Sequence, residues 1–330
     1  MARYCFITLL CLISIASYAH PPWGIAVDQS GNVYFADITH NGMGSVWKLT
    51  QKGKLELLLK DFHAHNVNLD QKGRLVTAHG ENNHTMVRLS DNGKLDTLFH
   101  TLDLKAFFGG NCTYSKQGNI YFKMDHHVWQ IDASGKKHKF NPKRLEWSQT
   151  IYVDDQERVY VPEIGGGRAD LYRLTADGQS ELIASNLITR LNRPRDKHND
   201  VLLGITQDEQ GIVYIAETAG RRIIKIDGHG GSETYYQPKS GWTPCAITFH
   251  NDKAYVLEYD LRGKMKGPRV TIVNANGKSK TLFDYDTYQD HGQMEPLNDD
   301  KGAYLYLILV IAVAVGLAMT VMRSTKRLSL

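Results

Sequence analysis

The chain repeats one arrangement of hydrophobic and polar positions six times. In the first copy, GIAVDQSGNVYFAD, an apolar strand, a tight polar turn and a second β-rich strand follow one another. Side chains alternate between the two faces of a strand, so such runs predict strands packed in sheets. The copies span Gly24 to Asp37, Asn66 to His79, Asn111 to Met124, Thr150 to Glu163, Gly204 to Glu217 and Cys245 to Glu258.

Each copy continues with a third strand, a glycine-containing turn and a fourth strand. The third strands are predicted over residues 46–49, 86–89, 128–131, 171–174, 223–226 and 270–273, and the turns contain Gly53, Gly93, Gly135, Gly178, Gly228 and Gly277. Four strands in roughly 44 residues form one propeller blade. A single sheet cannot bury both of its faces, whereas a ring of sheets can. The pattern therefore predicts an all-β, six-bladed β-propeller over residues 20–284, in preference to a β-sandwich or a solenoid.

The segments PWGIAVDQSGNVYFAD and GITQDEQGIVYIAETAGRRIIKI resemble NHL repeats. The resemblance covers nearly all of the propeller and implies a fold of the gluconolactonase-like (TolB-like) superfamily. It does not imply one function, because such propellers include enzymes, peptide binders and scaffolds.

Family site residues are mostly not matched in this chain. Gluconolactonase-like enzymes resemble one another in a Glu, two Asn and an Asp on the inner strands, several of them just before the position of Gly24. Peptidylglycine amidating lyases place one histidine at that level in each of three blades. In this chain the residues at that position, one before the start of each copy, are Trp23, His65, Gly110, Gln149, Leu203 and Pro244. They include no carboxylate and only one histidine, although the next residues in two copies, Asn66 and Asn111, offer oxygen atoms.

Two segments depart from the regular repeat. The first-turn positions Gly31, Gly73, Gly118, Glu157, Gly211 and Asp252 are spaced by 42, 45, 39, 54 and 41 residues. The longest interval contains an insertion, Ser185 to Asn199, before the fifth blade. Met265 to Pro268 lengthen a loop of the sixth blade. Long loops on a rigid scaffold often carry function.

The two ends of the chain indicate export and membrane attachment. Arg3, the apolar residues 4–16 and Ser17-Tyr18-Ala19 predict a signal peptide over residues 1–19, in preference to a buried helix or an uncleaved anchor. Residues 303–322 are uncharged and precede basic residues, which predicts a transmembrane helix with a cytoplasmic tail, residues 323–330. A sorting signal that is cut after export is the alternative. Residues 285–302 read as a flexible acidic stalk, so we expect an extracytoplasmic (periplasmic or extracellular) propeller.

Charge and cysteine content then narrow the function classes. The formal net charge of +4 arises from Arg3 and the three basic tail residues, so the predicted ectodomain is near neutral. A nucleic-acid surface would need a basic excess, so no nucleic-acid partner is expected. Cys112 and Cys245 start inner strands of the third and sixth blades, opposite each other. We expect two free, buried thiols, because a disulfide needs Cα atoms about 4.4–6.8 Å apart.

The repeat places polar residues around one mouth of the central channel. The second strands end at Asp37, His79, Met124, Glu163, Glu217 and Glu258. Oxygen ligands suit Ca²⁺, and histidines would suit Zn²⁺, which is the less favoured metal. The candidate metal ligands are Glu163, Glu217, Glu258, Asn66 and Asn111, and the candidate ligand-binding residues are Asp37, His65, His79, His198, Asn199 and Asp200. The alternative is structural: these acids cap turns or pair with the arginine of the next strand, and cations a few residues later, such as Arg168, Arg221 and Arg262, could compensate their charge.

Two functional hypotheses follow. The first is a membrane-tethered propeller that binds a small molecule, protein or peptide at the channel mouth. The second is a Ca²⁺-dependent hydrolase of the lactonase or arylesterase type, in which the metal polarises a carbonyl group. No GxSxG, Walker or HExxH motif occurs, so nucleophile-elbow, P-loop and zincin enzymes are not supported.

Overall fold

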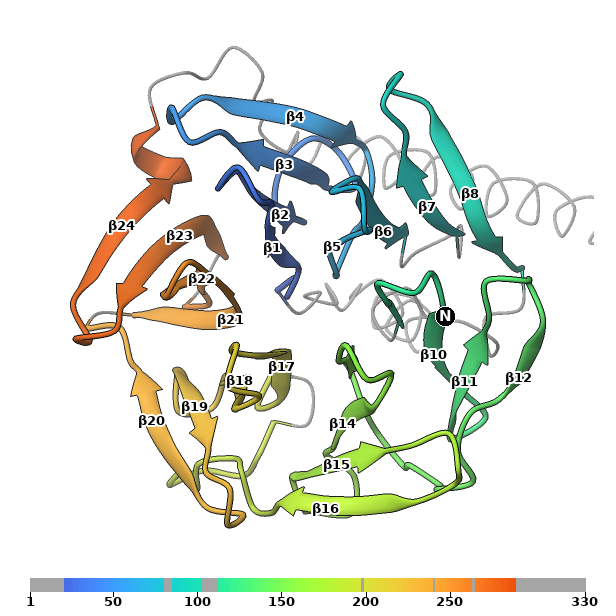
Figure 1. The fold of residues 1–330 in the computed structure, drawn as a ribbon. Coiled ribbons are helices and arrows are strands. Elements are labelled where there is room, and N and C mark those ends of the chain that lie inside the picture. Colours follow the sequence, from blue (N-terminus) through green and yellow to red (C-terminus); the bar gives the residue numbers. More distant parts are fainter. Residues whose placement is uncertain are drawn as a thin grey trace, which may run out of the picture.

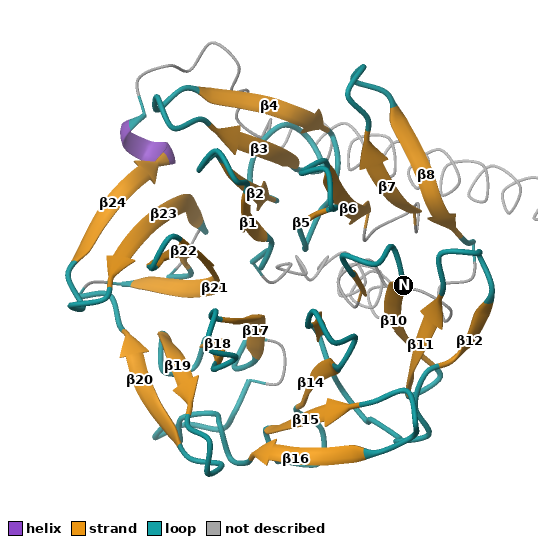
Figure 2. Ribbon diagram, in the orientation of Figure 1, coloured by secondary structure: helices purple, strands orange, loops and turns teal. Residues whose placement is uncertain are grey.

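Six four-stranded antiparallel sheets are arranged radially around a central axis, as Figure 1 shows. The computed structural model describes residues 21–79, 85–102, 112–196, 199–239, 241–262 and 265–288. Every sheet consists of four consecutive strands, so each is one blade, and the described part contains only one short 3₁₀ helix, η1 (Tyr285–Thr287; Figure 2). The predicted six-bladed propeller is confirmed.

The strands follow the predicted order from the axis outward. Blade 1 contains β1 (Ile25–Val27), β2 (Val33–Asp37), β3 (Ser45–Leu49) and β4 (Leu55–Lys60); blade 2 contains β5 (Asn68–Leu69), β6 (Leu75–His79), β7 (Thr85–Leu89) and β8 (Leu95–His100). Blade 3 contains β9 (Cys112–Tyr114), β10 (Ile120–Met124), β11 (His127–Ile131) and β12 (Lys137–Lys139); blade 4 contains β13 (Tyr152–Val153), β14 (Val159–Glu163), β15 (Asp170–Leu174) and β16 (Ser180–Ala184). Blade 5 contains β17 (Leu202–Gln207), β18 (Val213–Glu217), β19 (Arg222–Ile226) and β20 (Ser232–Tyr236); blade 6 contains β21 (Trp242–His250), β22 (Lys253–Asp260), β23 (Lys266–Asn274) and β24 (Ser279–Asp284).

An acidic side chain shapes the turn between the first two strands in several blades. Asp28 Oδ1 accepts hydrogen bonds from the backbone N–H groups of Ser30 and Asn32, both at 2.9 Å. Asp154 makes the equivalent pair of bonds in blade 4. Such side-chain contacts stabilise a tight turn locally, which is why the turn recurs wherever the motif recurs.

The core lies between the blades. The second strands β2, β6 and β18 are buried along their whole length, whereas the outer strands β8, β12 and β16 are largely exposed. Large side chains such as Trp47 and Phe35 are fully buried. Burial of apolar surface on both faces of each sheet stabilises the ring at about 25 cal/mol per Å² removed from water.

Side-chain contacts close the ring between blades 6 and 1. The Tyr288 hydroxyl accepts a hydrogen bond from Leu55 N–H at 2.9 Å, and the Tyr259 hydroxyl donates one to the Ala36 carbonyl at 2.9 Å. The rings of Phe35 and Phe283 lie 5.4 Å apart between centroids. Blade 6 takes all four strands from one continuous segment, so closure needs no strand exchanged between the chain ends.

Several details of the sequence prediction can be compared with the structure. All six predicted third strands are present, and both cysteines are free and buried. Gly228 lies in the predicted outer turn of blade 5, and the glycine with positive φ in that turn is Gly230. The expected long loop of blade 6 is mostly strand, because Lys266 pairs with Asp260 and extends the β22–β23 hairpin.

The predicted signal peptide, the transmembrane segment and almost all of the predicted stalk lie outside the described residues. Among the described residues, no helix has both the length and the apolar character needed to cross a bilayer.

Candidate functional site

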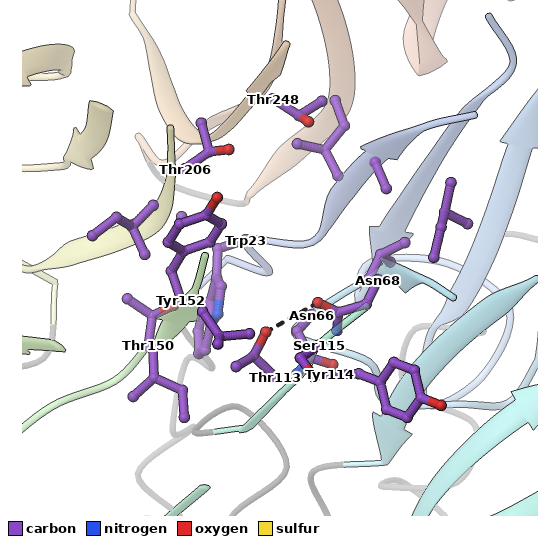
Figure 3. A pocket seen from close by; sticks show the side chains of 18 of the residues that line it. Trp23, Asn66, Asn68, Thr113, Tyr114, Ser115, Thr150, Tyr152, Thr206 and Thr248 are labelled. Carbon is purple, nitrogen blue, oxygen red and sulfur yellow. Dashed lines mark hydrogen bonds between the residues drawn. The ribbon is translucent and has the colours of Figure 1, made fainter. Parts of the chain in front are cut away.

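The inner strands line a cavity of about 270 Å³ along the axis (Figure 3). Its walls carry hydroxyl and amide groups, from Asn66, Asn68, Thr113, Thr150, Tyr152, Thr206 and Thr248. Thr113 Oγ1 donates a hydrogen bond to Asn68 Oδ1 at 3.2 Å. Aliphatic side chains and the charged residues Lys116, Asp154 and Asp155 complete the lining, so the channel offers hydrogen bonds together with both signs of charge.

Asp37, the acid that ends β2, is fully buried and has its hydrogen-bond partners within the protein. Its Oδ1 accepts from Thr39 N–H (2.8 Å) and Oγ1 (2.6 Å), and its Oδ2 lies 2.8 Å from His40 Nδ1 and 3.2 Å from Trp47 Nε1. The His40 ring stacks on Tyr285, which follows blade 6. Asp37 therefore supports the junction between the first and last blades.

Glu163 and Glu217 occupy the equivalent position in blades 4 and 5 and also tie adjacent blades together. Glu163 accepts hydrogen bonds from the backbone N–H groups of Glu146 (2.5 Å) and Trp147 (2.8 Å), in the connection from blade 3. Glu217, with no exposed surface, accepts from Thr189 N–H at 3.1 Å and Thr189 Oγ1 at 2.8 Å, in the connection from blade 4.

Glu258 in blade 6 completes the series. Its Oε1 accepts from the hydroxyl of Tyr236 on β20 of blade 5 at 3.0 Å. Its Oε2 accepts from Arg269 Nε (2.8 Å) and Thr271 Oγ1 (2.6 Å). Burial, followed by the Glu258 charge, raises the pKa of Tyr236 above its ordinary value. The recurring acid therefore joins its own blade to the preceding one.

Two of these acids pair with an arginine of the next strand, as the structural alternative predicts, but the compensating cations named from the sequence, Arg221 and Arg262, are not their partners. Glu217 pairs with Arg222 at 2.8 Å, not with Arg221. Glu258 pairs with Arg269 at 2.8 Å, whereas Arg262 pairs with Asp260. The reason is strand register: Glu217 lies opposite Arg222 and Glu258 opposite Arg269 across the second and third strands.

The candidate histidines and asparagine contact their own surroundings. His65 stacks on Trp23 with ring centroids 4.8 Å apart, and its Nε2 lies 3.0 Å from His63 Nε2. His79 packs edge-on against Phe62. Asn66 Nδ2 donates to the carbonyl and, at 3.0 Å, to the Sγ of Cys112, which links blades 2 and 3.

The described candidate metal ligands do not converge on one point. Glu163, Glu217 and Glu258 lie in three different blade junctions, and their oxygen atoms already accept hydrogen bonds from the protein. Within the described ranges, no group of three or more His, Cys, Asp and Glu side chains is placed to hold a metal ion. This donor set does not fit a Ca²⁺ cage, which takes 6–8 oxygen ligands. Asn111 and His198 lie outside the described residues.

The two thiols lie on inner strands, Cys112 at the start of β9 and Cys245 three residues after the start of β21, and neither is reactive. Burial raises the pKa of the Cys112 thiol to about 12, although the hydrogen bond from Asn66 acts in the opposite direction. Burial, with the Glu258 charge as a second cause, also raises the pKa of Cys245. Both groups are therefore neutral thiols near pH 7, and neither is an activated nucleophile.

A cavity of about 460 Å³ lies beside the channel mouth, between blades 5 and 6. It is bounded by the end of the insertion and by the β22–β23 hairpin, the two segments that depart from the repeat. Its lining includes Pro21, Leu191, Arg193, Asp196, Asn199, Asp200, Thr218, Ala219, Arg221, Gly241, Thr243, Leu261, Arg262 and Met265. Two predicted ligand-binding residues, Asn199 and Asp200, are thus brought together here.

Another cavity, of about 380 Å³, adjoins the cavity of about 460 Å³, and Leu191, Arg193 and Asp200 line both of them. It is also lined by Arg190 and Arg195 of the insertion. Sequence reasoning missed these arginines. The available signal was the density of arginine in residues 190–195, where three of six residues are arginine.

Comparisons with known proteins identify the fold. No family model matches the chain, and no curated protein matches it. A streptogramin B lyase structure is 17% identical over 81% of this chain and 84% of that one, with a TM-score of 0.55. A virginiamycin B lyase from Staphylococcus aureus is 16% identical over 79% of this chain and 83% of that one, with a TM-score of 0.53.

A gluconolactonase from Xanthomonas campestris is 16% identical over 72% of this chain and 84% of that one, with a TM-score of 0.55. At this level of identity the likeness concerns architecture alone. The chain is a six-bladed β-propeller with the fold of the streptogramin B lyase and gluconolactonase-like propellers.

Proposed function

We propose that this chain is a binding module that takes a small molecule beside the mouth of the propeller channel. The observation that carries the proposal is the meeting of the two irregular segments, residues 185–199 and the β22–β23 hairpin, around one cavity of about 460 Å³. The rest of the ring follows the blade repeat. Departures from a rigid repeat are where binding residues are usually placed.

The cavity has the size and composition of a ligand pocket. Pockets for small molecules commonly enclose about 300–1,000 Å³ and combine apolar walls with a few polar groups. Leu191, Leu261 and Met265 supply apolar surface, and Thr218 and Asn199 supply polar groups. Thr218 is fixed by a hydrogen bond from Val201 N–H to its Oγ1 at 2.8 Å, so this wall is preorganised.

The structural neighbours support a small-molecule ligand by analogy of fold. One virginiamycin B lyase structure was determined with quinupristin. We do not extend the proposal to lactonase or arylesterase catalysis, because the described carboxylates already have internal hydrogen-bond donors.

Filling the cavity tests the binding function. Ala219 lines it, and Ala219→Trp would occupy the space that a ligand needs. Ala275, in an exposed turn at the end of β23, gives a matched control, Ala275→Trp. We expect a small-molecule fragment library, screened by ligand-observed NMR, to contain fragments that bind the full chain and Ala275→Trp but bind Ala219→Trp at least about tenfold more weakly. Equal binding to both variants, or the absence of any binding fragment, would contradict the proposal.

We also propose that the propeller is exported and tethered to a membrane by residues 303–322. The uncharged segment, the basic residues after it and the N-terminal signal-like sequence support this location. A protease applied to intact cells or spheroplasts provides the measurement.

A further inference from the structure

We infer that the ligand of this site carries an anionic group, a carboxylate or a phosphate, bound by arginines of the 185–199 insertion between blades 4 and 5. The inference rests on the proposed function and adds the chemical class of the ligand. The anionic group would occupy the cavity of about 380 Å³, and the remainder of the ligand would extend into the adjoining cavity of about 460 Å³.

The charge balance of the smaller cavity is positive. Arg190, Arg193 and Arg195 line it, and Asp200 is the single carboxylate among its described lining residues. Arg193 and Asp200 form a two-pronged ion pair, with N–O distances of 2.7 and 2.8 Å. Asp200 also accepts a hydrogen bond from Asp196 N–H at 2.7 Å, so its charge is used to hold the loop.

Arg195 is held in place by backbone carbonyl groups, and no ion pair between its side chain and a carboxylate is found among the described residues. Its Nε donates to the Asp200 carbonyl at 3.2 Å, and one terminal nitrogen donates to the Arg168 carbonyl at 3.3 Å. The side chain is partly buried, and this desolvation lowers the pKa of its guanidinium below the ordinary value. An oxyanion would replace the lost hydration and use the remaining N–H donors, and guanidinium groups bind carboxylate and phosphate oxygens in pairs.

Two further arginines line the two cavities, Arg190 the smaller one and Arg221 the larger one. Arg190 is exposed, and so is Arg221, whose left-handed backbone (φ 52°) follows the end of β18. In the described part of the chain, neither forms an ion pair with a carboxylate. A bound anion would supply the opposite charge that these two arginines do not find in the described part of the chain.

The adjoining cavity indicates what the rest of the ligand resembles. Leu191 borders both cavities, and Leu261 and Met265 continue the apolar wall toward blade 6. A ligand with a charged head and an apolar body would place its head in the arginine-lined cavity and its body along the apolar wall. The arrangement therefore favours a compact amphiphilic anion over a neutral sugar-like molecule.

A series of six-carbon probes separates charge from apolar contact. Hexanoate and hexyl phosphate carry the two anionic heads, and hexanol is the neutral analogue. Titration calorimetry on the full chain at low salt should give dissociation constants at least about tenfold lower for one or both anions than for hexanol, since hydrogen bonds to charged groups are the stronger class. The preference between the two anions identifies the head group. Added salt should weaken anion binding.

Arginine variants test the assignment. Arg195→Gln should weaken binding of the preferred anion about tenfold or more and leave the affinity for hexanol unchanged. Arg190→Gln provides a second variant at an exposed side chain, in case Arg195→Gln disturbs the loop. Arg144→Gln, which removes an exposed arginine paired with Glu146 in the blade 3–4 connection, is the matched control and should bind normally.

The outcomes distinguish this inference from the proposed function. If hexanol binds as tightly as both anions, or if Arg195→Gln and Arg190→Gln bind the anions normally, the inference is wrong. Fragment binding that Ala219→Trp abolishes would, in that case, still support the pocket. Absence of all fragment and probe binding would overturn both.

Discussion

At the scale of single residues, the acidic side chain at the end of the second strand connects two neighbouring blades. Glu217 accepts from Thr189 of the preceding connection, from Gly220 N–H at 2.8 Å and from Arg222 of its own blade. Glu163 and Glu258 use other donors at the equivalent position. Glu217 and Glu258 have no exposed surface, and a buried carboxylate needs donors such as those that the two junctions offer.

Glu217→Gln should destabilise the protein by about 2–4 kcal/mol, because a neutral amide loses the charge-assisted bonds and leaves Arg222 unpaired. A chelator such as EDTA should leave the melting temperature of the wild-type chain unchanged, since Glu217 already has protein donors. Thermal unfolding followed by circular dichroism measures both effects.

Glu181→Gln is the control for this substitution. Glu181 is an exposed partner of Arg173, so its loss should change stability by less than about 1 kcal/mol. A melting temperature that falls in chelator, recovers with Ca²⁺ and becomes insensitive to chelator in Glu217→Gln would instead support a metal site.

At the scale of elements, the turn between the first and second strands keeps a positive φ at one aligned position while its sequence varies. Six aligned positions have positive φ: four are glycines, and Glu157 and Asp252 have φ values of 58° and 57°. In blade 6 the preceding Asn251 also has positive φ (48°), between His250 and Lys253, which pair as the ends of the hairpin. Two consecutive left-handed residues are typical of a type I′ turn, in which Asn-Gly is preferred.

Asp252→Gly should therefore raise the free energy of unfolding by roughly 0.4–1 kcal/mol, because glycine adopts this conformation without steric cost. The reciprocal change, Gly73→Ala, should lower it by about 1–2 kcal/mol. Gly73 has φ 74°, and a Cβ atom there would meet no neighbour within 4 Å, so the effect isolates the backbone. Urea unfolding of both variants checks the signs. If Asp252→Gly destabilises the protein, the aspartate side chain stabilises the fold by more than its left-handed backbone conformation costs.

At the scale of the whole molecule, the ring is closed by contacts between blades and carries its irregular segments beside one mouth. Tyr288 and Tyr259 join blade 6 to blade 1, and the insertion extends from blade 4 to blade 5. The walls of the proposed pocket are loop residues, apart from Thr243 of β21, and the closed ring holds the strands that these loops connect. A fixed scaffold under the loops reduces the ordering that binding requires, which favours affinity.

The proposed tether makes a prediction at this scale. Protease added to intact cells or spheroplasts should release the propeller, while the tail beyond Arg323 stays protected, because charged segments remain on the cytoplasmic side. Immunoblotting with antibodies to each part follows the fragments. Labelling that places Trp242 in the cytoplasm would overturn the export and anchor proposals together.

The sequence by itself determined the blade number, the strand order and most turns. These features depend on contacts close along the chain: strand alternation, turn residues and a repeat of about 44 residues. The same register predicted that Cys112 and Cys245 are free and buried, which is confirmed. Asn199 and Asp200 were selected because they approach an inner strand, and both line the proposed pocket.

Only the tertiary structure decided which groups meet. The partners of Glu163, Glu217 and Glu258 include residues of the preceding blade, and register selects Arg222 and Arg269 over nearer arginines in the chain. The proposed pocket joins Leu191, Ala219 and Leu261, which are far apart in sequence. The excess of arginine in the adjoining smaller cavity does not show in the near-neutral net charge of the propeller, because net charge is a sum over the chain, whereas a binding site depends on the few charges that the fold places together.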